Sequence, residues 1–518
     1  MASVSTFTNE PLADFSQAGN AAAQRAAIAQ VRGELGREYD LVIGGVRSRT
    51  SGKIRSINPA RPEELVGQHQ KAGAEHVEPA IAAALAAFAT WRFVPATERV
   101  AWLTRVAAIL RARKFEFNAW LIVEVGKNWA EAEADTCEAI DFCELYARLA
   151  LDMDQAEPVV QLPGERDVLR YLPLGVGAVI PPWNFPLAIL CGMTVASVVC
   201  GNTVVLKPSS DAPTIAAKFF EVMEDAGLPP GVVNFCPGAG ATFGDGLVAH
   251  SQTRFIAFTG SRDVGLHINQ SAAQQQPGQL WIKRCILEMG GKDGVIVAAD
   301  ADLDSAADGV TAAAFGFQGQ KCSACSRVIV EAPVYDRFLE ELLERVARLR
   351  LGSPEENAAM GPVINQGALD SILNYVAIGA AEGRIVAGGQ RAPGDGFVVQ
   401  PTVIADVAPE ARIAREEIFG PVLAVIRAND FTHALAIANG TDYGLTGAVY
   451  TASQEQIERA KREFHVGNLY INRKCTGAVV GAHPFGGFNM SGTDSKAGGA
   501  DYLYLFTQAK SIAEKVIS

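Results

Sequence analysis

Two stretches of the chain alternate short β-rich runs with helix-like runs, and this alternation limits the fold more than any other feature. The first stretch begins at residue 168 and has strand candidates at 177–180, 203–206, 232–235 and 255–258, with helix candidates near 214–226, 242–250 and 263–273. Strict alternation of strand and helix predicts a parallel, doubly wound sheet. Ligands of such sheets bind at the carboxyl ends of the strands, so the loops that follow these runs are the expected place for a site.

A second alternation runs from residue 294 to about 472. Its strand candidates are 294–297, 328–330, 422–426, 448–450 and 468–471, and its helix candidates include 303–315, 335–349 and 367–381. The 518 residues suffice for several domains, at the usual ~100–200 residues per domain. We therefore predict an α/β protein with two α/β domains.

The rest of the chain predicts smaller elements. Residues 20–39 have the spacing of an amphipathic helix, and 41–47 predict an edge hairpin that turns at Gly44 and Gly45. The helical pattern of 74–151 predicts three or four helices, interrupted at Pro79, Pro95 and Gly126. Two strand-like runs, 159–174 and 501–506, belong to neither alternation. Because unpaired strands often join the sheet of a second chain, we expect a homo-oligomer.

Composition argues against two kinds of partner. The net charge is −12 and no basic block is interleaved with aromatic residues, so a nucleic-acid partner has little electrostatic basis. No charged residue occurs between Arg170 and Lys207, but the cleanest apolar run there, 187–200, is shorter than the ~18 residues of a membrane span. We expect that run to be a buried core segment and predict no membrane role.

Cysteine usage bears on location. The nine cysteines have no repeated spacing, and the N-terminus has neither a secretory nor a transit signal. These features predict a reducing compartment, and we expect the cytoplasm.

Cys322 lies in a loop of sequence FGFQGQKCSACS (315–326), between a helix-like run and a β-rich run at 327–331. Such a loop can present a sulfur at a cleft. The thiolate is the reactive form, and an unperturbed thiol has a pKa of about 8.5. A cysteine nucleophile in this loop therefore needs backbone N–H groups or a helix N-terminus nearby to stabilise its thiolate. On the loop alone, a buried structural cysteine is favoured. The CxxC spacing with Cys325 lacks the second ligand pair of a zinc site.

Other stretches offer candidate sites, each with a plainer alternative. Residues 238–244 have the spacing GxGxxxG, which favours a tight turn into a helix over a dinucleotide fingerprint. The run Thr259-Gly260-Ser261 ends a strand candidate and opens a helix, which suits either a pyrophosphate or a plain N-cap. Glu288 precedes a Gly-Gly pair that allows close backbone approach to a ligand, although on this stretch alone a surface glutamate at a turn is favoured. The histidines are dispersed and neither HExxH nor GxSxG occurs, so no metal site is predicted.

Seven motifs in order resemble the aldehyde dehydrogenase superfamily over essentially the whole chain. They are PWNFP (182–186), KPS (207–209), FTGS (258–261), LEMGGK (287–292), GQKCSA (319–324), EEIFGP (416–421) and PFGGF (484–488). The resemblance implies the aldehyde dehydrogenase fold: a Rossmann-like NAD-binding domain, an α/β catalytic domain and a small β extension for oligomerisation. The implied boundaries are 1–40 for an N-terminal helical extension, 41–155 with 175–287 for the NAD-binding domain, 288–484 for the catalytic domain, and 156–174 with 490–518 for the oligomerisation flap.

The resemblance also implies catalytic roles. Cys322 resembles the nucleophile that adds to the aldehyde carbon, so that hydride can leave to a nicotinamide and a thioester forms. The side-chain amide of Asn184 and the backbone N–H of Cys322 resemble the oxyanion hole, in which each donor is typically worth about 2.7–4 kcal/mol. Glu288 resembles the base that activates the hydrolytic water.

NAD is the cofactor that the resemblance implies. Lys207 resembles the lysine that binds the adenosine ribose, Ser261 a phosphate contact, and Glu417 and Phe419 the residues that orient the nicotinamide ribose and ring. Strongly NAD-selective members often carry a glutamate where this chain has Ser210, so NADP stays open as a secondary cofactor. The full set implied for the cofactor is Pro182, Trp183, Lys207, Ser209, Ser210, Gly240, Thr259, Gly260, Ser261, Val264, Glu417 and Phe419.

Within the superfamily the detailed resemblance is to the glutamate-γ-semialdehyde dehydrogenases. It rests on Phe7–Pro11 with the helix that follows, EVGKNW (124–129), EAIDF (138–142), YGLTG (443–447), REFHVGNLYINRKCTGA (462–478) and PFGGFNMSGT (484–493). These enzymes carry out the second step of proline catabolism. The free N–H groups of Gly477 and Ala478 suit the α-carboxylate of such a substrate. The remaining substrate contacts implied are Glu138 for the α-amino group, Ser323 for the carboxylate, and Phe185 and Phe485 for the aliphatic chain.

The implied assembly is a homodimer that can build a hexamer, with transient contact to a proline dehydrogenase. Two alternatives stay open. One is a dehydrogenase of another semialdehyde or a CoA-acylating one, although Glu288 disfavours the CoA reaction because transfer to CoA needs no activated water. The other is a catalytically silent scaffold, which requires the loss of Cys322, Glu288 or Asn184, and all three are present.

Overall fold

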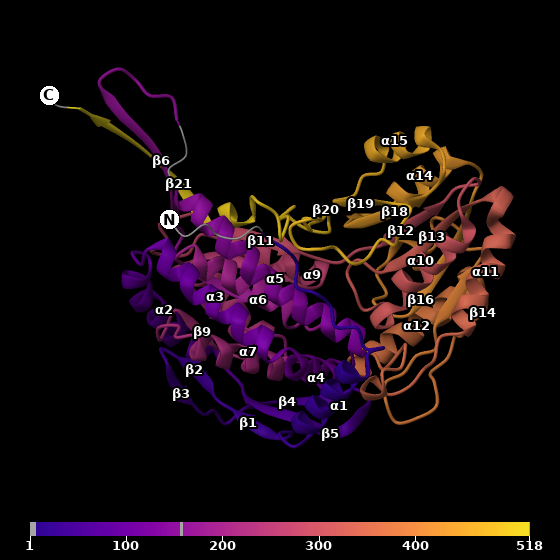
Figure 1. The fold of residues 1–518 in the computed structure, drawn as a ribbon, viewed down its shortest axis with the longest axis horizontal. Coiled ribbons are helices and arrows are strands. Elements are labelled where there is room, and N and C mark those ends of the chain that lie inside the picture. Colours follow the sequence, from indigo (N-terminus) through magenta and orange to yellow (C-terminus); the bar gives the residue numbers. More distant parts are fainter. Residues whose placement is uncertain (1–6, 156–158, 517–518) are drawn as a thin grey trace.

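The computed structural model describes residues 7–155 and 159–516, shown as a ribbon in Figure 1. Parts of the predicted N-terminal extension (1–6) and of the predicted flap (156–158 and 517–518) lie outside the described residues. Two large sheets, each covered by helices, make up most of the molecule.

The first sheet has seven strands in the order β11-β10-β7-β8-β9-β2-β3. They are β2 (Leu41–Ile43), β3 (Val46–Ser48), β7 (Val176–Ile180), β8 (Thr203–Leu206), β9 (Val233–Phe235), β10 (Thr253–Thr259) and β11 (Arg284–Glu288). From β11 to β9 every neighbour is parallel, whereas β2 and β3 add antiparallel pairs at one edge. All four predicted strands of the first alternation and the predicted edge hairpin are confirmed.

Nine helices accompany this sheet in the described part of the chain. They are α1 (Ala18–Arg32), α2 (Val77–Trp91), α3 (Ala96–Ala112), α4 (Lys114–Val125), α5 (Trp129–Asp154), α6 (Ala188–Val199), α7 (Pro213–Asp225), α8 (Asp245–Ala249) and α9 (Arg262–Ala273). The four helices α2 to α5 fulfil the prediction for 74–151, but the predicted break at Pro79 is wrong. Pro79 lies in the first turn of α2, where a missing N–H costs nothing.

The predicted helix over 20–39 is too long. Helix α1 ends at Arg32, and β1 (Arg37–Tyr39) joins a three-stranded sheet with β5 (Arg61–Gln70) and β4 (Lys53–Asn58). Tyr39 is buried there and stacks on His69 at 4.7 Å between ring centroids. The sequence did not predict this small sheet, because β4 and β5 interleave apolar residues with many charged ones.

The second large sheet has the order β14-β15-β16-β13-β12-β18-β19 and is parallel except at β14. Its strands are β12 (Asp293–Val297), β13 (Cys325–Glu331), β14 (Arg384–Ala387), β15 (Thr402–Ala405), β16 (Val422–Ala428), β18 (Thr446–Tyr450) and β19 (Asn468–Ile471). Its helices are α10 (Leu303–Phe315), α11 (Tyr335–Ala347), α12 (Gln366–Glu382), α13 (Arg412–Arg415), α14 (Phe431–Asn439) and α15 (Gln454–Glu463). Val295 and Val297 of β12 belong to one hydrophobic cluster and Ile296 to another, so this strand is buried on both faces.

A two-stranded ribbon projects from the body of the molecule, with the C-terminus near its tip (Figure 1). It pairs β6 (Glu165–Pro173) antiparallel with β21 (Thr507–Lys515). The predicted strand at 501–506 is wrong, because Tyr502–Phe506 form a 3₁₀ turn. Tyr502 is buried and stacks on Tyr146 at 5.5 Å, so these apolar residues pack into the core and the strand begins only at Thr507. A short pair, β17 (Tyr443–Gly444) with β20 (Phe488–Asn489), completes the strands.

The uncharged run 187–200 forms α6, which is buried in the largest hydrophobic cluster. Among the described residues no helix combines the length and the apolar character that crossing a bilayer requires.

Candidate active site

A cavity of about 820 Å³ opens at the carboxyl ends of the parallel strands of the first sheet. The residues directly after β7, β8, β10 and β11 line it, and Cys322, Glu417 and Phe419 of the other half of the molecule complete its wall. Every residue predicted for the cofactor lies in this lining. The cavity therefore lies at the strand ends, where the sequence predicts the site.

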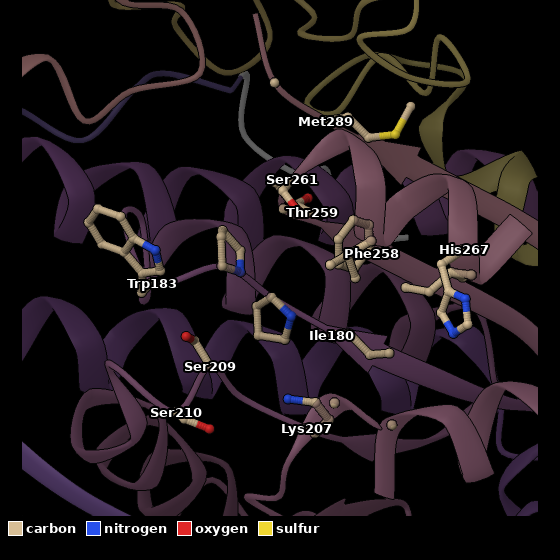
Figure 2. Close-up of a pocket in the computed structure, with 18 of the residues that line it drawn as sticks. Ile180, Trp183, Lys207, Ser209, Ser210, Phe258, Thr259, Ser261, His267 and Met289 are labelled. Carbon is tan, nitrogen blue, oxygen red and sulfur yellow. The ribbon is translucent and has the colours of Figure 1, made fainter. Parts of the chain in front are cut away.

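Lys207 and two serines form one side of the cavity. In Figure 2 the ammonium group of Lys207 and the hydroxyls of Ser209 and Ser210 lie across the pocket from Thr259 and Ser261. The Lys207 Nζ donates to the carbonyl of Pro208 at 3.1 Å, and burial lowers the pKa of the ammonium to about 8. An ammonium holds three protons, so donors are left for a ligand in the cavity.

The facing side is the start of helix α9. Ser261 is its N-cap, with extended backbone (φ −68°, ψ 150°), and its side chain makes no capping hydrogen bond. The first N–H groups of a helix have no partner within the helix and favour anions. Gly240 opens a π-type turn, Gly240–Gly244, before α8, and nothing lies within 4 Å of where its Cβ would be. The cavity thus combines the first N–H groups of a helix with open backbone at Gly240.

Glu417 and Phe419 reach the cavity from the loop before β16. The Oε1 atom of Glu417 accepts a hydrogen bond from the Gly291 N–H at 2.9 Å, and burial raises the pKa of its carboxyl to about 7. A Cβ on Gly290 would lie 2.1 Å from Glu417 Oε2, so a larger residue there would displace the Glu417 carboxylate. Phe419 has a left-handed backbone (φ 58°) and packs edge-on against Trp183 at 5.5 Å between ring centroids.

Cys322 lies in the loop between a 3₁₀ turn (Gly316–Gly319) and β13, and it is half-buried. Burial, with the nearby carboxyls of Asp293, Glu288 and Glu417, raises the pKa of its thiol well above the ordinary value. The N–H of Ser323 acts in the opposite direction and is outweighed. The predicted stabilisation of the thiolate by backbone N–H groups is therefore insufficient in this structure. The sulfur of Cys322 carries its proton at neutral pH.

Asn184 is tied to the loop that carries the nucleophile. Its Nδ2 atom donates to the carbonyl of Gln320 at 3.1 Å, two residues before Cys322, and Asn184 is only 4% exposed. Gln320 is itself fixed, because its Oε1 accepts from the Ile364 N–H at 2.9 Å. The amide of Asn184 and the backbone of Cys322 are thus held near each other by one short connection.

Glu288 ends strand β11, but it is not part of the cavity lining. Its Oε1 atom accepts from the Ser495 hydroxyl at 2.6 Å, and its Oε2 atom finds no hydrogen-bond partner within the described part of the chain. Burial raises the pKa of the carboxyl to about 8, although Ser495 and Lys496 lower it. A base with such a pKa is partly ionised near neutral pH.

The residues predicted for the substrate lie outside the cavity lining, and two of them, Phe185 and Glu138, lie beside a buried group of charges. The Lys127 ammonium lies 3.9 Å from the ring centroid of Phe185 and forms a fully buried ion pair with Asp135 at 2.9 Å. Burial raises the pKa of Glu138 to about 8; the charge of Asp135 also raises it, and those of Lys127 and Lys321 lower it. Of the predicted substrate residues, Phe185 and Glu138 therefore lie beside these charges rather than in the nucleotide cavity.

The loop around Gly477 has several cations beside it. Gly477 has a left-handed backbone (φ 77°), and a Cβ there would lie 3.8 Å from Lys474 Nζ and 3.9 Å from an Arg473 nitrogen. Cys475, just before this loop, donates its thiol to the Ser323 carbonyl at 3.4 Å. Ala478 follows Gly477 directly, and Phe485 pairs with Ala497 near Glu288. This surrounding positive charge suits a carboxylate.

Several residues that hold the site had not been predicted. Gln320 and Ser495 position Asn184 and Glu288, and Lys127 with Asp135 supports Phe185 and the start of α6, where Asp135 accepts from the Ala188 N–H at 2.7 Å. Gln320 is part of the GQKCSA motif (319–324) and could have been suspected. Ser495 and Asp135 carry no local signal, since their partners are 207 and 53 residues away.

The fold and the cavity define an α/β enzyme of the aldehyde dehydrogenase fold, as the sequence predicted. The model of the aldehyde dehydrogenase family matches residues 46–512, and the chain belongs to this family.

Its relatives match it from end to end. A 1-pyrroline-5-carboxylate dehydrogenase of Geobacillus thermodenitrificans is 56% identical over 512 residues, which cover 99% of each chain. The crystal structure of 1-pyrroline-5-carboxylate dehydrogenase from Thermus with bound NAD is 51% identical, with a TM-score of 0.98, and covers 99% of this chain and 100% of the other. Proline utilization A from Bdellovibrio bacteriovorus is 46% identical with a TM-score of 0.98, and the match covers 99% of this chain and 54% of that longer one.

Proposed function

We propose that the protein oxidises L-glutamate γ-semialdehyde, which is in equilibrium with 1-pyrroline-5-carboxylate, to L-glutamate with NAD. This is the second step of proline catabolism. The single observation that carries the reaction type is the position of Cys322 in the wall of a nucleotide-sized cavity, with Asn184 tied to its loop. The identity of the substrate is supported by the full-length likeness to 1-pyrroline-5-carboxylate dehydrogenases.

The residues of the cavity fit NAD. Lys207, with donors to spare, suits the adenosine ribose, and the N-terminus of α9 at Ser261 suits the pyrophosphate. The Glu417 carboxylate suits the hydroxyls of the nicotinamide ribose, and Phe419 and Trp183 supply an aromatic wall for the ring. NAD, when bound, accepts the hydride. NADP stays a secondary cofactor, since the uncharged Ser210 does not repel a 2′-phosphate.

Each protein group then has one task. The sulfur of Cys322 loses its proton and adds to the aldehyde carbon, which becomes tetrahedral. The Asn184 amide and the Cys322 N–H donate to the oxygen that carries the developing negative charge. Once the thioester has formed, the Glu288 carboxylate takes a proton from water, and the resulting hydroxide attacks the thioester and frees the Cys322 sulfur.

The substrate contacts are part of this proposal. The N–H groups of Gly477 and Ala478, with Ser323 and the neighbouring Arg473 and Lys474, receive the α-carboxylate. Glu138 receives the α-amino group, because a carboxylate in the same buried group of charges complements a cation. The rings of Phe185 and Phe485 enclose the aliphatic chain between these ends and Cys322.

The assembly, the location and the domain boundaries are proposals too. Exposed apolar side chains lie on the projecting ribbon and beside it: Ile512 in β21, Val516 directly after β21, and Val160 and Leu162 before β6. They support a homodimer built through this flap and a hexamer beyond it. Nine free cysteines support the cytoplasm. Transient contact with a proline dehydrogenase follows from the shared intermediate. The domain limits stay those that the family resemblance implied.

The test is the rate of NADH formation with 1-pyrroline-5-carboxylate, compared with a panel of other semialdehydes and with NADP. Preference for 1-pyrroline-5-carboxylate and NAD supports the proposal, and preference for another aldehyde overturns the substrate. Cys322→Ala abolishes turnover, whereas Cys325→Ala retains it, because the Cys325 thiol is buried and bonded to the Arg327 carbonyl at 3.4 Å.

A further inference from the structure

The carboxylate of Glu288 lies against a stretch of the chain near the C-terminus, 485–497, which we call the C-terminal segment. The Ser495 hydroxyl donates to Glu288 Oε1 at 2.6 Å, a short distance typical of a hydrogen bond to a charged oxygen. Glycines leave room for this contact, since a Cβ on Gly486 or Gly492 would lie 3.2 or 3.1 Å from the same oxygen. The C-terminal segment thus packs closely against the Glu288 carboxylate through one serine and two glycines.

The segment is fixed to the strand that carries Glu288. The Thr493 N–H donates to the Leu287 carbonyl at 2.9 Å, and the Met289 N–H donates to the Ser491 carbonyl at 2.7 Å. These two bonds bracket Glu288 on both sides. The Lys496 ammonium donates to the carbonyls of Gly467 and Gly486, at 2.8 and 2.7 Å, and so fixes the residue after Ser495.

Four titratable groups surround the Glu288 carboxyl. Lys496 lowers its pKa and Asp494 raises it, and the ionised carboxylate in turn raises the pKa of Cys322 and of Tyr502. Among them only Lys496 is a cation, and its protons are used by backbone carbonyls and by an ion pair with Asp494 at 3.1 Å. In the part of the chain that is described, Ser495 supplies the side-chain hydrogen bond that favours the ionised carboxylate.

We propose that Ser495 is a positioning residue: its hydroxyl favours the ionised form of the Glu288 carboxyl and holds this group against the C-terminal segment, outside the cavity that Cys322 lines, until water is activated. The inference deepens the proposed function and rests on Glu288 acting as the base. The contact between Ser495 and Glu288 separates the two chemical steps in time. Oxidation of the aldehyde proceeds with the carboxylate held aside, and hydrolysis of the thioester uses the same ionised group.

The first test needs neither substrate nor cofactor. Infrared difference spectra of the free enzyme over a pH series report the titration of Glu288, identified as the carboxyl band that Glu288→Gln removes. In Ser495→Ala the midpoint rises by about 1 to 2 pH units, because one hydrogen bond to the charged form is lost. Ser495→Thr keeps the hydroxyl and keeps the midpoint of the native enzyme.

Ser491→Ala is the matched control. It removes a serine hydroxyl from the same segment, but that hydroxyl accepts from the Gly444 N–H at 3.0 Å and does not contact the carboxylate. The control leaves the midpoint unchanged. An unchanged midpoint in Ser495→Ala, or an equal rise in Ser491→Ala, overturns the assignment.

The second test separates the two chemical steps with the full enzyme, NAD and 1-pyrroline-5-carboxylate. The burst of NADH in the first turnover stays within about twofold in Ser495→Ala, while steady-state turnover at pH 7 falls about tenfold and recovers at higher pH. If Ser495→Ala lowers the NADH burst and the steady-state turnover by the same factor, the positioning role is overturned. If the native enzyme does not oxidise this substrate, the proposed function fails, but the titration still decides the role of Ser495.

Discussion

Asn184 and Gln320 join the two halves of the active site. The side-chain amide of Asn184, in the loop after β7, donates to the Gln320 carbonyl at 3.1 Å, in the loop that presents Cys322. One loop comes from the nucleotide-binding sheet and the other leads into the second sheet. The bond therefore sets the distance between the proposed oxyanion donor and the nucleophile.

Asn184→Ala lowers kcat by about 100- to 1,000-fold, because one donor to the oxyanion is lost. The loss is in the chemistry, so the affinity for NAD, measured by quenching of protein fluorescence, stays near that of the native enzyme. A parallel loss of NAD affinity would show that the substitution collapses the loop after β7 and would remove the evidence for an oxyanion role.

The rate of thioester hydrolysis depends on pH through Glu288. Burial raises the pKa of this carboxyl to about 8, and a base works only when deprotonated. Hydrolysis therefore rises as pH increases through about 8 and falls about tenfold for each pH unit below that range. Steady-state rates across a pH series, taken where the NADH burst shows hydrolysis to be limiting, measure the profile. Glu288→Gln abolishes the pH-dependent limb; a limb that persists in this variant belongs to another group.

Ser210→Glu makes the enzyme more selective for NAD. The residue lines the cavity, and a carboxylate there repels the 2′-phosphate of NADP. We expect kcat/KM for NADP to fall about tenfold or more, a difference of about 1.4 kcal/mol, with a much smaller change for NAD. Ser210→Gln has a side chain of the same length without the charge and serves as the control. An equal fall in kcat/KM for NADP with both variants would mean that the size of the side chain, and not its charge, determines the selectivity.

Lys127→Met destabilises the protein. The Lys127 ammonium and the Asp135 carboxylate are fully buried and 2.9 Å apart, so removal of the cation leaves an unpaired buried charge. We expect a loss of about 3–5 kcal/mol, seen as a lower thermal unfolding temperature. Arg348→Met breaks an exposed pair with Glu344 and costs about 1 kcal/mol or less. Recovery of stability in the double variant Lys127→Met, Asp135→Leu attributes the loss to the unpaired charge, and no recovery contradicts it.

The sequence predicted most strands of the two large sheets because those strands are mainly apolar and lie between clear helical patterns. It did not predict β14 and β15. Runs such as Thr203–Leu206 and Asn468–Ile471 match strands β8 and β19 residue for residue. Where the outcome depended on tertiary packing, the prediction failed. Tyr502–Phe506 has the composition of a strand, but its aromatic rings pack in the core and the segment forms a 3₁₀ turn. The strand is formed instead by the more polar residues that follow it.

The same distinction holds for the site. Residues named by motifs, such as Lys207, Ser261 and Glu417, line one cavity. Lys207 follows a strand, Ser261 opens a helix and Glu417 lies in the loop before β16. The groups that hold the catalytic side chains could not be predicted. Ser495 reaches Glu288 across 207 positions of sequence, and no local pattern marks a serine in an irregular segment. The high pKa of the Cys322 thiol likewise depends on burial and on three carboxyls, which only the fold brings together.

The most direct test of the central claim is rapid chemical quenching of the enzyme with 1-pyrroline-5-carboxylate and NAD, followed by mass spectrometry of the peptide that contains Cys322. The account predicts a glutamyl thioester on Cys322 that accumulates in Glu288→Gln, where hydrolysis is blocked, and is absent in Cys322→Ala. Product formation without an acylated Cys322 would contradict it.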